Sequence, residues 1–510
     1  MTVKSRGVGL VGIEGYLVEV QVGSAEGLPG FDITGLPAAS LREARYRVRS
    51  ALRASGYGWP ERRVVANFAP ADLPKSGTAF DLPLAVALLA HQGIVPREAA
   101  EAPVFFGELG LDGSTRAVPG AINAALAARE AGCKQVFVPA HNAAEAALVP
   151  EVEVIAVGSV VEVVEALRGE RLLPRAVPDL AEAAAEAGTD LAFVRGQLRA
   201  RRALEVAAAG RHNILMVGPP GCGKTLLARA LPGILPPLTL DESLEVTRIH
   251  SVSGLVDPGA PLVRTRPFRA PHSTASYAAL VGGGTQPRPG EVSLAHRGVL
   301  FLDEVAEFSR HGLDALRAPI EDRQVRISRS ARSVVFPASF ALVAAMNPCP
   351  CGHHGDPAYA CRCTASKVTA YRQRISGPLL DRIDIHVELT AVSPEELANR
   401  PLGESSSAVR GRVVAARNVQ LARNTTAAET RVMNAELDLG AIERHAALGV
   451  EERQFLARAG RRLGLSARSW QRVIRVARTI ADLAQAEHIE RAHLAEALTY
   501  RRAVQEAGPG

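Results

Sequence analysis

The chain has 510 residues, of which 47% are hydrophobic and 22% charged, so it is long enough for about three ordinary soluble domains. No apolar run reaches the roughly 18 residues of a membrane span, and the first residues lack the charged head and apolar centre of a secretory signal. We therefore expect a cytoplasmic protein with no membrane partner. The net charge of +6 is too small over this length to indicate a nucleic-acid partner by itself.

The first part of the chain, residues 1–168, alternates short apolar stretches with alanine-rich ones and is expected to form an α+β domain. Residues 104–110 and 134–140 are predicted strands, and 121–132 is the helix between them. Residues 169–190 are rich in proline, alanine and charge, with little apolar periodicity, which predicts a linker.

A second α/β block is expected over residues 191–390. Its clearest strands, within 213–218, 298–304 and 340–347, are nearly continuous apolar runs, as expected of a parallel sheet buried on both faces. Residues 391–510 have the periodicity of helices, and no repeat of fixed length is present in the chain.

The strongest motif is GPPGCGKT, which follows the first of these strands and opens a helix, as a phosphate-binding P-loop does. Glycines let successive backbone N–H groups face one anion. Lys224 is one of only five lysines among 59 basic residues, and it would reach the phosphates, while the Thr225 hydroxyl would ligate Mg²⁺. The residues expected to bind nucleotide are Gly218, Pro219, Pro220, Gly221, Cys222, Gly223, Lys224 and Thr225.

Polar residues follow the other two strands. Asp303 and Glu304 end GVLFLDE, where Asp303 would hold Mg²⁺ and Glu304 would polarise the attacking water. Asn347 either orients that water or only begins the turn that follows. Arg382 lies between a helix end and an apolar strand, and it either reaches a neighbouring subunit's γ-phosphate or forms a surface ion pair.

Four cysteines within fifteen residues have the spacing C-x-C-x₉-C-x-C, which predicts a tetrahedral structural Zn²⁺ site. The pairs are tighter than the usual C-x₂-C, so reduced thiols on a long loop are the alternative. The four cysteines are Cys349, Cys351, Cys361 and Cys363, with His353 and His354 as substitute ligands.

Residues 248–297 and 321–337 are expected to interrupt the ATPase core as basic insertions, the second as a hairpin. Arginine-rich loops suit sequence-independent contacts with a nucleic-acid backbone, although such residues also occur on solvated faces. Few aromatic residues accompany them, which disfavours base stacking. The expected DNA contacts are Arg264, Arg266, Arg269, Arg326, Arg329 and Arg332.

With these residues identified, the chain resembles the AAA+ ATPases of the magnesium-chelatase/MCM branch and, more closely, the YifB/ComM family. The resemblance covers nearly the whole chain and is carried by FDITGLP, NFAPADLPKSGTAFDLPLA, ARRALEVAAAGRHNILMVGPPGCGKT, RPFRAPHSTAS, GEVSLAHRGVLFLDE, NPCPCG and VARTIADL. It implies a homo-hexameric ring with ATP and Mg²⁺ as cofactors and a C-terminal helical lid. By that resemblance Asn347 is similar to sensor 1, Arg382 to the arginine finger and Arg468 to sensor 2.

For ComM-like members the resemblance implies helicase and branch-migration activity on single-stranded or branched DNA during recombination or natural transformation. Two other functions stay open: a regulatory or protein-remodelling AAA+ ATPase, and the motor subunit of a metal chelatase.

The N-terminal block resembles the Lon protease domain, but its residues do not support proteolysis. Ala79 stands at the position of the nucleophilic serine, and Ile122 at that of the lysine base. Without a nucleophile and its base there is no acyl-transfer chemistry, so this domain is expected to be catalytically inactive.

Overall fold

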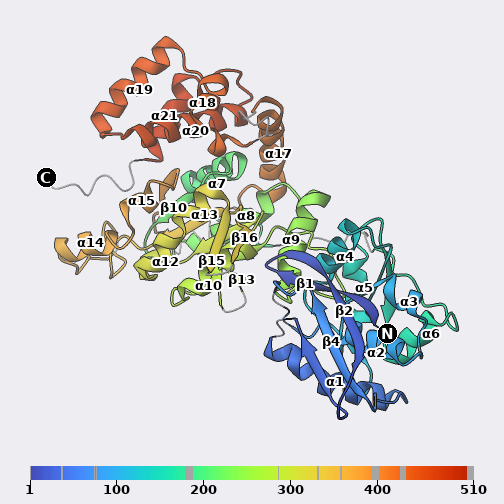
Figure 1. Ribbon diagram of the computed structural model, residues 1–510. Coiled ribbons are helices and arrows are strands. Elements are labelled where there is room, and N and C mark those ends of the chain that lie inside the picture. The colour runs from blue at the N-terminus through green and yellow to red at the C-terminus, as the bar shows by residue number, and fades with distance from the viewer. Residues whose placement is uncertain are drawn as a thin grey trace.

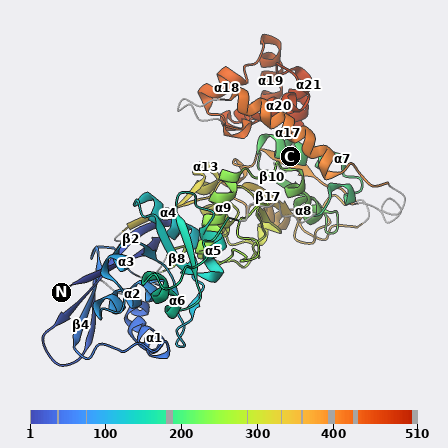
Figure 2. The same ribbon diagram turned by 90° about the vertical axis from the view of Figure 1, so that its right-hand side faces the viewer.

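The computed structural model describes residues 2–35, 38–73, 75, 77–178, 188–284, 287–329, 332–356, 359–391, 401–424 and 432–501. An N-terminal α/β region, a central parallel sheet with its helices, and a group of C-terminal helices follow one another in space (Figures 1 and 2). Among the described residues, no helix combines the length and apolar character that a membrane crossing requires.

The N-terminal region is built on one seven-stranded mixed sheet. The first two strands form a long antiparallel pair, and β4 extends it antiparallel, whereas all the other neighbours are parallel. In sheet order the strands are β3 (Phe31–Thr34), β4 (Arg63–Ala69), β2 (Glu14–Ala25), β1 (Val3–Val11), β5 (Val104–Phe105), β8 (Gln135–Pro139) and β9 (Glu153–Val157).

Helices cover both faces of this sheet, because successive strand residues point to opposite sides. Phe105 packs with residues of helices α1, α2 and α6, whereas Val104 packs with residues of α4 and α5. These helices are α1 (Ala39–Ala54), α2 (Asp81–His91), α4 (Ala121–Glu130), α5 (Ala140–Ala146) and α6 (Val160–Leu167), and the smaller elements are α3 (Arg97–Glu101), β6 (Glu108–Leu109) and β7 (Thr115–Arg116).

Two sequence expectations for this region need correction. The strand predicted over 104–110 is divided into β5 and β6, with β6 pairing in a separate small hairpin with β7. The linker predicted over 169–190 begins later, because Leu173 is buried in the domain core and Arg175 bridges to Ile155 of β9. Residues 179–187 of that linker lie outside the described residues.

The central sheet has five parallel strands in the order β11 (Phe268–Arg269), β14 (Val299–Leu302), β17 (Ala341–Met346), β10 (Ile214–Val217) and β18 (Ile385–Glu388). The parallel sheet predicted from the three apolar runs is therefore confirmed. Strand β11 lies within 248–297, so that stretch is not wholly an insertion: it also supplies the edge strand of the core sheet.

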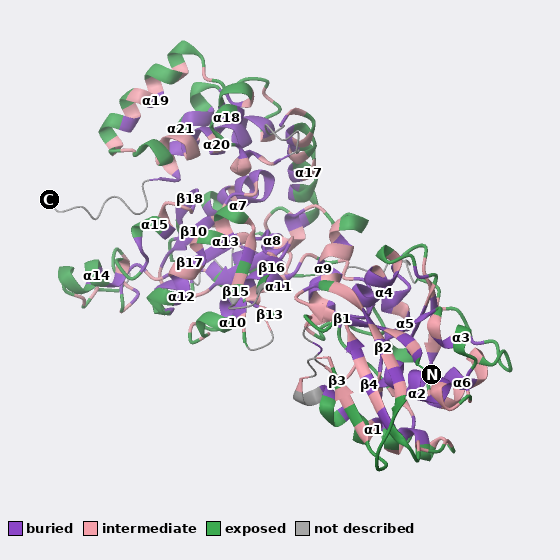
Figure 3. Cartoon of the chain, viewed as in Figure 1, coloured by how far each residue is buried: buried purple, intermediate pink, exposed green. Residues whose placement is uncertain are grey.

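Both faces of the central sheet are buried (Figure 3). Helices α7 (Leu198–Gly210) and α8 (Lys224–Ile234) cover one face, and α9 (Leu240–Val252) covers the other. The smaller elements are α10 (Tyr277–Val281), β12 (Gly282–Gly283), β13 (Arg288–Pro289), α11 (Glu291–Leu294), α12 (Arg310–Ala315), α13 (Arg317–Asp322), β15 (Gln324–Arg329), β16 (Arg332–Pro337), α14 (Ala365–Arg372) and α15 (Gly377–Leu380).

The C-terminal region is helical wherever it is described, as the sequence predicts. Its residues share one hydrophobic core with α7 and α8, so it packs against these helices on the side of the central sheet that they cover. Its elements are α17 (Ser406–Arg423), the 3₁₀ turn η3 (Asn434–Glu436), α18 (Leu439–His445), α19 (Val450–Leu463), α20 (Ala467–Leu483) and α21 (Arg491–Thr499).

Helix α9 also joins the central region to the N-terminal region, where it packs beside α4. Arg248 forms an ion pair of 3.3 Å with Glu14, and the Ser251 hydroxyl donates a hydrogen bond to the buried Glu145 carboxylate. Burial raises the pKa of Glu145 above its usual value. The N-terminal region is thus held to the core by polar contacts along α9 and by apolar packing, since Ile13 is buried in one cluster with Val334 and Phe336 of β16.

Candidate functional site

The P-loop connects β10 to α8, and α8 begins at Lys224. Gly221 and Gly223 have φ angles of 75° and 95°, a region that L side chains rarely adopt. Gly218 has no room for a side chain, because a Cβ there would lie 2.8 Å from the Cys222 sulfur and from the Leu389 carbonyl oxygen. The glycine spacing therefore serves both backbone conformation and close packing.

The Lys224 ammonium is turned back over the loop. It donates hydrogen bonds to the carbonyl oxygens of Gly218 and Pro219, at 2.7 and 2.8 Å, and to Asn347 Oδ1 at 3.1 Å. Only 8% of Lys224 is exposed. The structure thus brings Asn347, at the end of β17, to the same point as the P-loop lysine.

Asp303 and Glu304 follow β14 and lie beside Thr225 of the P-loop. The Thr225 hydroxyl donates to Asp303 Oδ2 at 2.9 Å, and the Glu304 N–H donates to Asp303 Oδ1 at 3.0 Å. Glu304 has a left-handed φ of 48°, which costs a non-glycine residue about 1–2 kcal/mol. This conformation turns its exposed carboxylate away from the buried strand and toward the hollow.

These side chains line a hollow of about 410 Å³ together with P-loop backbone. Its donor set fits a nucleoside triphosphate with its metal. The P-loop N–H groups at the start of α8 favour phosphate oxygens, and a hydroxyl beside a carboxylate is the oxygen ligand pair that Mg²⁺ prefers.

Two residues without a predicted role line an adjoining hollow. His272 and Ser273, in the segment after β11, line it together with Thr225, Asp303 and Glu304. The signal was present in the sequence, since RPFRAPHSTAS precedes GVLFLDE, but only the pairing of β11 with β14 places the two segments side by side.

Gln197 and Asn213 also support the site without having been predicted. Gln197 donates to the carbonyl oxygens of Cys222 and Thr390, at 3.2 and 2.6 Å, and so ties the P-loop to the chain after β18. Asn213 accepts from the Leu342 N–H and donates to the Arg382 carbonyl oxygen. Single polar residues that hold backbone have no recognisable sequence pattern.

Arg382 and Arg468 do not line the hollow of their own chain. Arg382 precedes β18 and therefore lies at the amino edge of the sheet, opposite the P-loop. It pairs with Glu321 at 2.8 Å and donates to the Pro378 carbonyl oxygen at 2.7 Å. Arg468 is exposed in the first turn of α20.

The four cysteine sulfurs lie within 4.8 Å of one another. Cys349, Cys351 and Cys361 are separated by 3.4 to 3.7 Å between sulfurs, and all of the cysteines are free of disulfides. Thiolates arranged tetrahedrally about 2.3 Å from zinc lie about 3.8 Å apart. The geometry therefore fits a four-thiolate metal site, as the spacing predicts.

This cysteine loop packs against the P-loop. A Cβ on Gly352 would lie 2.7 Å from Pro220 Cδ, so the two loops touch at a point where no side chain fits. His354 and Asp356 line a cavity of about 420 Å³ with Gly218 and Pro219. A metal bound by the cysteines would hold the loop that follows Asn347 against the P-loop.

We expect the purified protein to contain about one Zn²⁺ per chain. Because both pairs contribute ligands, the double variant Cys361→Ser/Cys363→Ser should lose the metal and lower ATP turnover through the contact with Pro220. Metal analysis and ATPase assays measure the two effects, with Cys133→Ser as the control, since Cys133 is buried in the N-terminal core. Metal-free wild-type protein with full turnover would contradict the zinc site.

The basic residues of 248–297 are less accessible than expected. The Arg266 side chain is 9% exposed and donates to the carbonyl oxygens of Pro236 and Arg297, so its predicted DNA contact is wrong. Arg269 is held by Glu291 through two bonds of 2.6 and 2.8 Å, which neutralise its charge. Arg264 is half-buried.

The predicted hairpin within 321–337 is confirmed as β15 and β16, with Arg329 paired to Arg332 at its far end. Arg326 is exposed. The structure describes the backbone of Arg329 and Arg332 but not their side chains, and residues 330–331 lie outside the described residues. The small hairpin β12–β13 adjoins this one, since a Cβ on Gly282 would lie 3.2 Å from Ile327 Cδ1. The two hairpins therefore lie side by side, and Val334 of β16 also lies against Gly12 of the N-terminal region.

The parallel sheet, the P-loop and the acidic pair define a P-loop ATPase of the AAA+ magnesium-chelatase type. The family described as magnesium chelatase, subunit ChlI, matches residues 190–397, while subunit ChlI of Mg-chelatase matches 18–142 and the ChlI C-terminal family matches 403–501.

The chain is 44% identical over 493 residues to the uncharacterized protein YifB of Salmonella typhimurium, covering 96% of this chain and 95% of that protein. It is 42% identical over 501 residues to the competence protein ComM of Haemophilus influenzae, covering 97% and 96%. The magnesium-chelatase 38 kDa subunit of Cereibacter sphaeroides is 27% identical over 169 residues, covering 30% and 51%. The chain belongs to the YifB/ComM family.

Proposed function

We propose that this protein is an ATP-driven ring motor that acts on DNA, with helicase or branch-migration activity. The observation that carries the proposal is the juxtaposition of Lys224, Thr225, Asp303 and Asn347 at the carboxyl edge of the parallel sheet, where open α/β sheets bind ligands. The similarity to a competence protein over nearly the whole chain supports DNA as the partner.

In this proposal the P-loop N–H groups and Lys224 bind the phosphates, and phosphate oxygens replace the carbonyl acceptors that now surround the ammonium. Thr225 and Asp303 hold Mg²⁺, which neutralises phosphate charge when bound. Glu304 accepts a proton from the attacking water, while the Asn347 amide, fixed beside Lys224, orients that water.

The two remaining arginines require neighbouring subunits. Arg382 faces away from its own P-loop and supplies positive charge to the nucleotide of the next subunit, with Asn213 holding its backbone in place. Arg468 acts as the second sensor from the C-terminal helices, which form the lid. Both roles favour a closed homo-hexameric ring.

The two adjoining hairpins are the proposed DNA surface, with Arg326, Arg329 and Arg332 as backbone contacts. Arg326 is exposed, and an exposed guanidinium group on a narrow hairpin binds phosphates without reading bases.

We propose that the N-terminal region has a Lon-like fold but no peptidase activity. Ala79 has no reactive group, and Ile122 is 1% exposed in an apolar core. We propose a cytoplasmic location, where ATP and DNA are both present.

DNA should stimulate ATP turnover, and the stimulation should decrease with added salt, because phosphate contacts release counterions. Replacing Arg326 with Ala should weaken DNA binding and reduce the salt slope by about 1. Arg458→Ala, at an exposed position on α19, is the matched control and should behave like wild type. Turnover indifferent to DNA at every salt concentration would favour a protein-remodelling ATPase instead.

A further inference from the structure

A further cavity, of about 170 Å³, lies at the amino edge of the central sheet. Arg211 precedes β10 there, Arg266 precedes β11 and Arg297 precedes β14, so all three guanidinium groups approach from the side opposite the P-loop. Strand β10 has four residues, which at roughly 3.3 Å each separate the two edges by about 13 Å. This cavity is therefore distinct from the nucleotide site.

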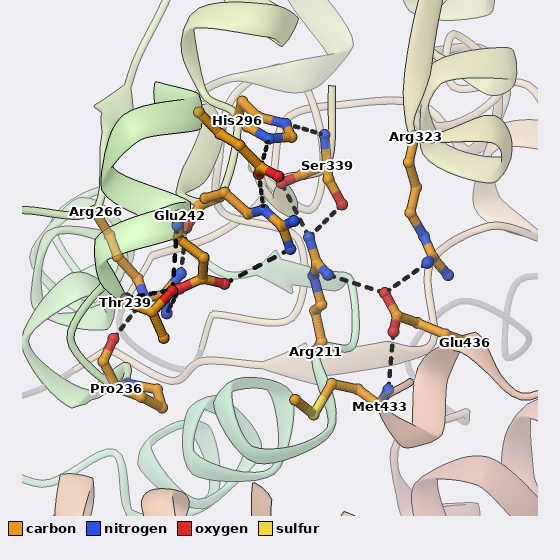
Figure 4. A network of polar contacts seen from close by, with 12 residues as sticks. Arg211, Pro236, Thr239, Glu242, Arg266, His296, Arg323, Ser339, Met433 and Glu436 are labelled. Carbon is orange, nitrogen blue, oxygen red and sulfur yellow. Dashed lines mark hydrogen bonds and ion pairs between the residues drawn. The ribbon is translucent and has the colours of Figure 1, made fainter. Parts of the chain in front are cut away.

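The cavity joins two regions of the protein. Arg417 lines it from α17, and Glu436 lines it from η3, both in the C-terminal helical region. Arg211 donates to Glu436 Oε1 at 2.9 Å and to the Ser339 carbonyl oxygen at 3.0 Å (Figure 4). A ligand that holds the lining residues of both regions together would therefore also stabilise the packing of the C-terminal helices on the core.

Cations outnumber anions around the cavity. Arg211 and Arg323 share Glu436, and Arg266 and Arg297 share Glu242. Glu245 binds Arg297, and His296 beside it is kept uncharged because burial lowers its pKa. Four arginines thus line the cavity with two glutamates, since Arg417 lines it as well, while Arg323 and Glu245 lie outside the lining.

Arg417 is the cation without a counterion. Its guanidinium donates two hydrogen bonds, of 3.0 and 2.6 Å, to the Ala208 carbonyl oxygen, and no carboxylate among the described residues pairs with it. Burial, together with repulsion from Arg266 and Arg211, lowers the pKa of Arg417 to about 9. An anion in the cavity would relieve this repulsion.

The backbone supplies an independent indication that guanidinium groups are required here. Arg211, Arg297 and Arg323 have φ angles of 63°, 60° and 54°, in the left-handed region that favours glycine. Arg211 and Arg323 stand at helix C-termini, where glycine is the usual residue. An arginine held in this conformation at three places around one cavity points to a ligand for its side chain.

We propose that this cavity is a binding site for inorganic phosphate. The bound phosphate would link the core to the C-terminal helices. A tetrahedral oxyanion matches the forked donors of several arginines, and the enclosed volume suits a free ion better than a nucleotide. Bound phosphate would neutralise the surplus charge between α17 and the sheet and so hold the helical region on the core.

The test uses the full chain carrying Lys224→Ala, so that the P-loop does not contribute to phosphate binding. Inorganic phosphate should bind in a calorimetric titration and raise the unfolding temperature above that in chloride at equal ionic strength. Arg417→Met should weaken binding about tenfold or more, since one charged hydrogen-bond donor is lost, while Arg410→Met, exposed on the same helix, should not.

Arg211→Gly provides a second variant, because glycine suits the backbone at this position while the guanidinium is lost. It should fold and bind phosphate more weakly. The proposal is overturned if Lys224→Ala protein shows no phosphate binding, or if Arg417→Met and Arg211→Gly titrate like their parent. Adenosine monophosphate that binds in an Arg417-dependent manner would overturn the assignment to the free ion.

Discussion

Replacing Glu304 with Gln should lower ATP turnover by roughly 10²–10⁴-fold while leaving ATP binding intact, because a general base is removed from a site whose phosphate contacts come from other residues. The expected product is a long-lived ATP-bound form. In the structure the backbone of Glu304 makes its hydrogen bonds, since its N–H donates to Asp303 and its carbonyl oxygen accepts from the Glu307 N–H, so the isosteric amide should not disturb the P-loop.

Lys224→Ala is the companion variant, and it should abolish nucleotide binding. Its ammonium is the cation within reach of the P-loop carbonyls and Asn347, so its loss removes phosphate attraction at the centre of the hollow. Equilibrium binding of a fluorescent ATP analogue and single-turnover hydrolysis separate the two variants. Normal hydrolysis by Glu304→Gln would show that another group activates the water.

Arg382→Ala should give assembled rings whose ATP turnover is reduced by about 10³-fold or more. An arginine supplied in trans stabilises transition-state charge to that extent. The Arg382 side chain is 13% exposed and that of Glu321 is 52% exposed, so solvent screens their ion pair from one side and folding should not depend on this pair alone.

Two controls make the arginine experiment decisive. Glu321→Ala removes the partner of Arg382 within its own chain but leaves the guanidinium available to a neighbour, and it should retain turnover. Mixing Arg382→Ala subunits with Lys224→Ala subunits should restore some hydrolysis, because an intact arginine then meets an intact P-loop. Full turnover by Arg382→Ala alone would refute the trans role.

The cysteine cluster and the arginine-lined cavity lie on opposite edges of the same sheet. The cysteine loop contacts the P-loop through Gly352 and Pro220, whereas the cavity contacts the C-terminal helices through Arg417 and Glu436. One would stabilise the site where nucleotide binds, and the other the packing of the lid. The zinc and phosphate experiments therefore test different parts of the ATPase.

The sequence by itself determined the phosphate site and the sheet that carries it. Glycines at fixed spacing, a lysine and a hydroxyl have few alternative uses after a buried strand, and continuous apolar runs indicate a sheet covered on both faces. The acidic pair and Asn347 line one hollow with the P-loop because parallel strands end at one edge, and their roles stay predictions. The close spacing of four cysteines was likewise a local signal, and the sulfurs converge as expected.

Whether each arginine is buried, paired or exposed depends on the tertiary structure. Arg266, Arg269 and Arg326 look alike in the sequence, yet the first is buried, the second is paired with Glu291 and the third is exposed. Charge at a position does not indicate whether the fold surrounds it with carboxylates or water, because those partners come from distant segments. For the same physical reason, only the packing of α17 against α7 and α8 places Arg417 among the arginines of the core and forms the arginine-lined cavity.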